Sequence, residues 1–150
     1  MFGKKLKTPP VIEDLATAYN DAAIESAFKL TKNMFDNSEQ TIPILENILE
    51  NLFVELHEVN LKKRIGLGPN EHDREQWANL WGFYLGETLR KMYGGKWLYG
   101  HEEAPHIPCL EFENGVAVFP TAKIFKRLEN GKPDNIVEYC NLIKQEMQAT

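Results

Sequence analysis

The fold is decided by residues 77–97, WANLWGFYLGETLRKMYGGKW, which predict a helix that ends at a double glycine and continues as a strand. Apolar and aromatic residues recur in it at three- and four-residue steps, a spacing typical of a helix with one broad buried face. The residues of this face are Trp77, Trp81, Tyr84, Leu85, Thr88, Leu89 and Met92. Gly82 and Gly86 lie one turn apart, although each costs about 1 kcal/mol relative to Ala. We therefore expect both to mark the closest backbone approach between this helix and the sheet or another helix.

The remaining composition is that of an ordinary globular protein. The chain has 150 residues, of which 43% are hydrophobic and 26% charged. A chain of this length can bury one sizeable core, so residues 1–150 are predicted to form a single domain. The net charge of -5 repels phosphate backbones and disfavours a nucleic-acid partner. The short basic runs at 4–7, 62–64 and 123–127 are interpreted as solvated helix ends or faces.

The two cysteines, Cys109 and Cys140, bear on the cellular compartment. No apolar run is long enough for a signal peptide or a membrane span, which favours the cytoplasm and no membrane partner. In that compartment both thiols are expected to be reduced and to behave as partly buried, small apolar side chains rather than as a disulfide.

Two helices are predicted ahead of the central one. Thr8 with Pro9-Pro10 indicates the first start, and the second begins near Thr41 with Pro43 in its first turn. The inner face of the first helix is predicted to hold Ile12, Leu15, Tyr19, Ala22, Ala23, Ala27, Leu30 and Met34. The second has an apolar face of Ile44, Leu45, Ile48, Leu49, Leu52, Phe53 and Leu56. The short break at 37–38 makes the pair an antiparallel hairpin.

The ends of the second helix and the start of the central one are marked by charge and glycine. The run 62–64 is predicted to lie at the carboxyl end of the second helix, where cations favour the helix dipole. Gly66 and Gly68 then supply the loop conformations that stop it. Asn70 is the predicted cap of the central helix, with Glu71 and Asp73 in its first turn.

After the double glycine the chain turns to strands. Residues 96–99 read as a first strand and 100–108 as a loop. Asn114-Gly115 stands between two β-prone runs, which predicts a type I′ hairpin. Pro120 begins a helix that ends at Gly131, and Pro133-Asp134 begins the last helix with Asp134 as cap. The predicted class is α+β, with an N-terminal helical hairpin, a long central helix, about three antiparallel strands and two C-terminal helices.

Candidate chemistry gathers in the loop that carries His101, Glu102, Glu103 and His106. The two histidines are one residue too far apart for an HExxH zinc motif, and Pro105 interrupts the helix that such a motif needs. A solvated loop is therefore favoured over a metal site. Cys109 follows His106 by three residues, but no orienting group or oxyanion site accompanies the pair.

Other residue groups give weaker signals. Histidine also occurs at His57 and His72, and His72 lies near Asp73 and Glu75, with Glu87 further along the helix. These are interpreted as charges of the helix start, because adjacent helical residues point to different faces. The aromatic residues of the central helix and first strand are interpreted as core rather than as a stacking site. We therefore assign no catalytic, cofactor-binding or metal-binding residue and expect no cofactor.

Residues 80–143 resemble a broad group of small uncharacterised bacterial proteins, some of them immunity-like. The shared pattern is a Gly-x-x-x-Gly-Glu helix, a Gly-Gly-x-Trp turn and strand, Phe-Pro, and Lys-Arg-Leu-x-Asn-Gly. It is carried by Gly82, Gly86, Glu87, Gly94, Gly95, Trp97, Phe119, Pro120, Lys126, Arg127, Leu128, Asn130 and Gly131. These are packing and turn residues, so the resemblance implies a helix, a small antiparallel sheet and closing helices. It offers no catalytic residue.

Three functional hypotheses follow. The first is a cytoplasmic, non-enzymatic protein that binds another protein, with the immunity-like resemblance implying a toxin as partner. The acidic balance suits a basic partner. The second is a small hydrolase or metal-dependent enzyme that uses the 101–109 loop. The third is a scaffold or interaction protein without a toxin.

Overall fold

The computed structural model describes residues 11–59 and 61–149, so the helix start predicted at Thr8 lies outside the described residues. Six α-helices, two short 3₁₀ turns and three strands make up this part of the chain. The helices are α1 (Ile12–Thr31), α2 (Ile42–His57), α3 (Leu61–Arg64), α4 (Glu71–Tyr93), α5 (Pro120–Asn130) and α6 (Ile136–Gln148). The strands are β1 (Lys96–Leu98), β2 (Cys109–Glu111) and β3 (Ala117–Val118), in antiparallel order β1-β2-β3. The predicted α+β class and three-stranded sheet are confirmed.

The helix α4 is the centre of the molecule. Asn70 caps it through a capping box: its side chain accepts from the Asp73 N–H, and the Asp73 carboxylate accepts from the Asn70 N–H. From Trp81 to Leu89 every residue is buried, which a single buried face does not produce. The reason is that both α1 and α5 pack on α4, so the helix is enclosed on more than one side.

The two glycines of α4 lie at close contacts, as predicted. A Cβ added at Gly82 would lie 2.4 Å from the Thr121 Cα, so the backbones of α4 and α5 meet there. At Gly86 a Cβ would lie 2.2 Å from the Cη2 atom of the Trp97 ring, so the close neighbour there is a side chain of β1 rather than backbone. The double glycine turns β1 back along α4 and places that ring over Gly86.

The first two helices pack on different parts of the body. α1 lies mainly on α4, whereas α2 lies on α5 and α6. The predicted inner face of α1 is wrong at Ala22, Leu30 and Met34, which are exposed. Its buried stripe instead includes Ala16 and Asn20. Leu30 lies in the last turn of α1 on the exposed side, and Met34 lies beyond the end of the helix at Thr31. The predicted start of α2, with Pro43 in the first turn, is confirmed.

A buried hydrogen-bond network attaches the segment between α1 and α2 to α4. Asn37, in the left-handed region at φ +61°, exchanges two hydrogen bonds of 2.9 Å with the side chain of Asn20. Its backbone N–H donates to the Tyr84 hydroxyl at 2.9 Å, and its side chain donates to the Thr88 hydroxyl at 3.1 Å. Because each polar group has a partner, the network is compatible with burial.

Three local predictions are corrected. α2 ends at His57, and 62–64 belong to the separate one-turn helix α3. The hairpin is not type I′, because Asn114 lacks the positive φ that this turn requires. Its loop spans 113–115: the Phe112 N–H donates to the Val116 carbonyl, and Gly115 takes the left-handed conformation at φ +90°. The cap of α6 is Asn135 rather than Asp134, since the Asn135 side chain accepts from two backbone N–H groups of the first turn.

Candidate functional site

The histidines of the 101–109 loop are not brought together around a common centre. The His101 ring packs edge-on against Phe119 at 5.4 Å between ring centroids, and its Nδ1 accepts from the Glu103 N–H at 3.1 Å. His106 is exposed at the other end of the loop. Among residues 11–59 and 61–149, no group of three or more His, Cys, Asp and Glu side chains is placed to hold a metal ion.

The two thiols lack the environment of a nucleophile. Cys109 and Cys140 are free and buried. Burial raises the pKa of Cys109, and it raises the pKa of Cys140 to about 12. A nucleophilic cysteine needs the opposite shift, since the thiolate is the reactive form. These shifts do not favour a thiolate at Cys109, so they lend no support to a nucleophilic pair of Cys109 and His106.

The carboxylates near the start of α4 have separate structural contacts. Asp73 belongs to the capping box, and Glu71 forms an ion pair with Arg74. Glu87 lies about 22 Å further along the helix from His72, at 1.5 Å per residue. It accepts hydrogen bonds from the Trp97 indole at 2.7 Å and from Arg90 at 2.9 Å. Burial opposes ionisation of Glu87, but the hydrogen bonds from Arg90 and Trp97 outweigh it and lower its pKa.

Sequence reasoning missed a buried ion cluster between α2 and α5. Arg127 is fully buried, so its interpretation as a solvated charge was wrong, whereas Lys126 is exposed as expected. The guanidinium lies 2.7 Å from a Glu46 carboxylate oxygen and 2.6 Å from one of Glu50. Glu46 also accepts from the Ile136 N–H, so it supports the start of α6. The available signal was the Glu46–Glu50 pair, four residues apart on an apolar helix.

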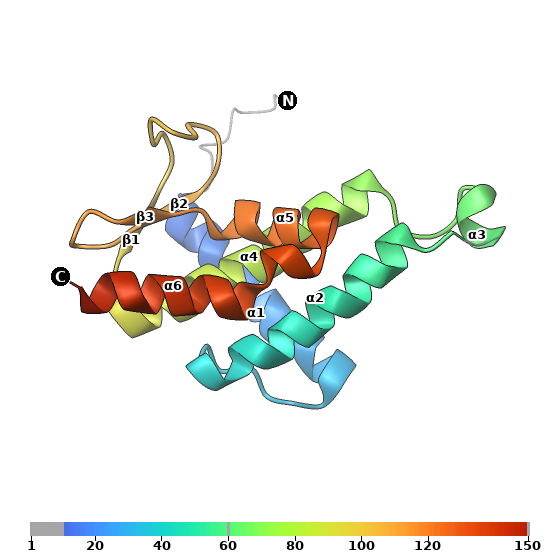
Figure 1. Cartoon of the computed structure of the whole chain (residues 1–150), viewed down its shortest axis with the longest axis horizontal. Helices are drawn as coiled ribbons and strands as arrows, with labels where there is room; N and C mark the ends of the chain where they lie inside the picture. Colours follow the sequence, from blue (N-terminus) through green and yellow to red (C-terminus); the bar gives the residue numbers. More distant parts are fainter. Residues whose placement is uncertain (1–10, 60, 150) are drawn as a thin grey trace, which may run out of the picture.

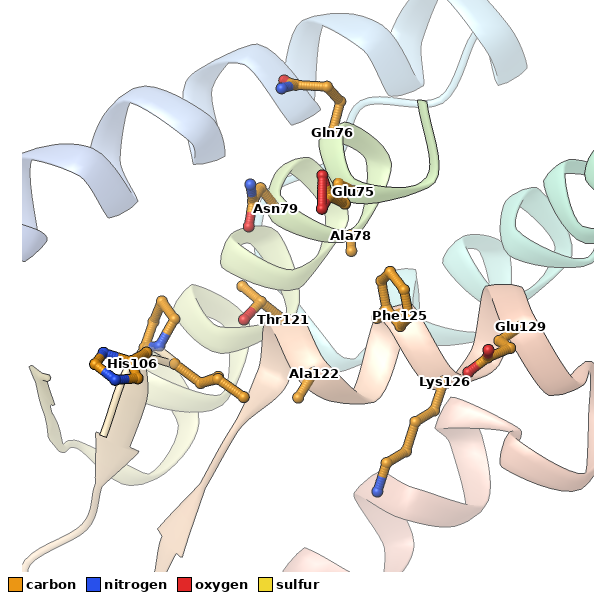
Figure 2. Close-up of a pocket in the computed structure, with 12 residues that line it drawn as sticks. Glu75, Gln76, Ala78, Asn79, His106, Thr121, Ala122, Phe125, Lys126 and Glu129 are labelled. Atoms are coloured by element: carbon orange, nitrogen blue, oxygen red, sulfur yellow. The ribbon is translucent and has the colours of Figure 1, made fainter. Parts of the chain in front are cut away.

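An open groove runs between α4 and α5. Its volume is about 520 Å³, within the range of about 300–1,000 Å³ typical of ligand pockets. Its lining comes from three segments: Glu75, Gln76, Ala78 and Asn79 on α4, Thr121, Ala122, Phe125, Lys126 and Glu129 on α5, and His106, Ile107 and Pro108 in the loop. Figure 2 shows that Glu75 and Asn79 extend from α4, while the Lys126 side chain extends away from that helix.

The second unusual surface is a projecting turn around α3, which we call the knob: residues 59 and 61–67. Figure 1 shows α3 standing beyond the end of α2, at the opposite end of the molecule from the sheet. Gly66, at φ +83°, ends the turn, where the Leu67 N–H donates to the Lys62 carbonyl and the Gly66 N–H to the Lys63 carbonyl. This pattern is a complete Schellman motif, so the knob has a defined local conformation.

The knob exposes large apolar side chains at its surface. Its four large aliphatic side chains are 57–85% exposed: Val59, Leu61, Ile65 and Leu67. Between them lie three cations, Lys62, Lys63 and Arg64, and the Lys63 ammonium donates to the Leu56 carbonyl. Clustered exposed apolar side chains of this kind mark an interaction surface.

Comparison with known proteins adds no relative: no family model, curated protein or solved structure matches the chain. Within the described ranges, none of the helices combines the length and apolar character needed to cross a bilayer.

Proposed function

We propose that this protein acts by binding another protein through the knob. The observation that carries the proposal is the exposure of four large aliphatic side chains on a turn whose backbone is already ordered by a Schellman motif. In the isolated chain these side chains are exposed, so they add little to the stability of the fold. Against a partner, each contributes about 1.5–3 kcal/mol when fully buried, and a preordered turn loses little conformational entropy.

The charges of the knob restrict the surface that it contacts. A net charge of -5 favours a basic partner at long range. Lys62 and Arg64, however, repel cations at short range. The partner therefore meets the knob with an apolar hollow that has an acidic rim, whatever the net charge of the rest of its surface.

We propose that this binding takes place in the cytoplasm and that the protein is an immunity protein, which neutralises a toxin of the same or a neighbouring cell. The two free, buried thiols are consistent with a reducing compartment. Support for the toxin comes from the resemblance of residues 80–143 to immunity-like proteins. Non-enzymatic action is supported by the structural use of the charged groups, since Glu46, Glu87 and Arg127 all have buried structural partners.

The test begins with capture from the native cell by three proteins: the parent, Ile65→Asp and the matched control Leu142→Asp. Leu142 is an equally exposed aliphatic residue on α6, remote in sequence from the knob. We expect a protein that the parent and the Leu142 variant retain and the Ile65 variant loses. That protein is then purified, and its inhibition is titrated.

Inhibition of the purified partner should saturate near an equal molar ratio, as binding requires. Turnover of the partner by trace amounts of this protein would contradict a stoichiometric role. The immunity role further predicts that expression of the partner alone is toxic and that co-expression of the parent, but not of Ile65→Asp, restores growth.

A further inference from the structure

The surface that the knob requires is present on this same chain. The groove between α4 and α5 is lined by the apolar residues Ala78, Ala122 and Phe125 and by the carboxylate of Glu75, which extends from α4. No ion pair joins Glu75 to another residue of the described part. We propose that the knob of one copy docks into the α4–α5 groove of a second copy.

Size and shape support this contact. A hollow of about 520 Å³ is large enough for a drug-sized ligand and therefore for two aliphatic side chains. Leu61 and Ile65 lie one turn apart at the knob, where the Ile65 N–H donates to the Leu61 carbonyl, so both project from one compact turn. Figure 1 shows α3 standing away from the other helices, which leaves the knob accessible to a second molecule.

Charge also favours the contact. Lys62 and Arg64 flank the aliphatic side chains of the knob, and Glu75 offers them an anionic partner. Of the other charges, Glu129 lies 3.8 Å from Arg74, which stands outside the groove lining, and the Lys126 side chain extends away from α4. The attraction is therefore centred on the α4 side of the groove.

An anionic membrane suits the knob less well. Lipid recognition by charge typically uses about four to eight clustered cations, and the knob has three. Glu55 and Glu58 also line the same small hollow as Lys62 and Lys63, and they reduce the positive potential there. The inference needs no partner protein and does not rest on the proposed function. Where both hold, self-association covers the knob and competes with the partner.

Sedimentation equilibrium of the full chain tests the contact. The parent should show an average mass that rises above 17.3 kDa as its concentration increases to about 100 μM, where micromolar contacts are populated. The double variant Leu61→Asp/Ile65→Asp makes the contact side of the knob polar and acidic. Ala122→Arg places a large side chain in the groove and keeps a residue of good helix propensity in α5. Each variant alone should stay monomeric, whereas the control Leu142→Asp should associate like the parent.

Mixing the two defective variants decides the geometry. The Ala122→Arg variant keeps an intact knob, and the double aspartate variant keeps an intact groove. Their equimolar mixture should therefore recover association, with the two proteins in equal amounts. The exchanged pair Lys62→Glu with Glu75→Lys should likewise associate better in one chain than either single variant does. Circular dichroism and thermal unfolding identify any variant that fails to fold.

Several results would overturn the inference. One is a parent that remains monomeric at every concentration; another is a mixture of the two variants that stays monomeric. Association that Ala122→Arg leaves intact would mean that knobs meet one another instead. Co-sedimentation of the monomeric parent with vesicles containing anionic lipid, lost in the double aspartate variant, would assign the knob to a membrane surface.

Discussion

Two regions of this molecule invert the usual relation between polarity and burial. On α5, the guanidinium of Arg127 is fully buried, while on the knob four large aliphatic side chains are more than half exposed. Arg127 tolerates burial because Glu46 and Glu50 approach it from another helix. Within residues 11–59 and 61–149, no element covers the four aliphatic side chains of the knob. The comparison shows that burial follows the surrounding elements rather than the polarity of the residue itself.

The strongest test of the comparison removes the buried charge. Arg127→Met should lower the free energy of unfolding by about 3–5 kcal/mol, because it leaves two carboxylates without their cation. Adding Glu46→Gln should recover part of this loss, since the amide oxygen still accepts from the Ile136 N–H. Urea unfolding measures both. The exposed neighbour Lys126→Met is the control, and a loss as large in that variant would show that the ion cluster is not the cause.

Filling the close contacts of α4 should have a smaller effect. Gly82→Leu and Gly86→Leu should each destabilise the protein by about 1–3 kcal/mol through overpacking. Gly82 should be the less tolerant site, because it faces Thr121 backbone whereas Gly86 faces the Trp97 side chain. Ala18→Leu, at an exposed position of α1, is the control for bulk on a helix surface. Unchanged stability in both glycine variants would refute the close packing of α4.

A third effect depends on pH. Glu87 has a lowered pKa in the folded protein, so its ionised form adds stability above its ordinary value of 4.5. That contribution is lost as the pH falls from this value through the folded-state pKa. Glu87→Gln should cost about 1–2 kcal/mol at pH 7 and flatten the decline of stability below pH 4.5. A variant with the same acid profile as the parent would contradict this role; chemical unfolding at a series of pH values provides the measurement.

The smallest effect on stability should come from the knob. Ile65→Asp should change the free energy of unfolding by less than about 0.5 kcal/mol, because the side chain is exposed. An aspartate introduced inside α4 by Leu85→Asp should prevent stable folding, because Leu85 has no exposed surface. Thermal unfolding of the two variants checks this contrast. A large loss at Ile65 would mean that the knob packs within its own chain.

The candidate surfaces were only partly accessible to sequence reasoning. The groove joins residues near 76, 107 and 125, and no local pattern places these three segments together. The sequence predicts that the basic run 62–64 lies at the end of α2, and this placement gives no indication that its aliphatic neighbours are exposed. Periodicity predicts that one face of a helix is apolar, but it does not state whether a neighbour covers that face.

The sequence by itself determined the features that depend on residues within one or two turns of each other. These include the Asn70 cap, the start of α2 at Pro43, the stop of α5 at Gly131 and the α+β order of elements. Only the tertiary structure decided which residues are enclosed. Arg127 meets Glu46 across 81 positions of the chain, and Gly82 meets Thr121 on another helix. Capping and periodicity are local interactions, whereas burial is set by whichever distant element packs against a side chain.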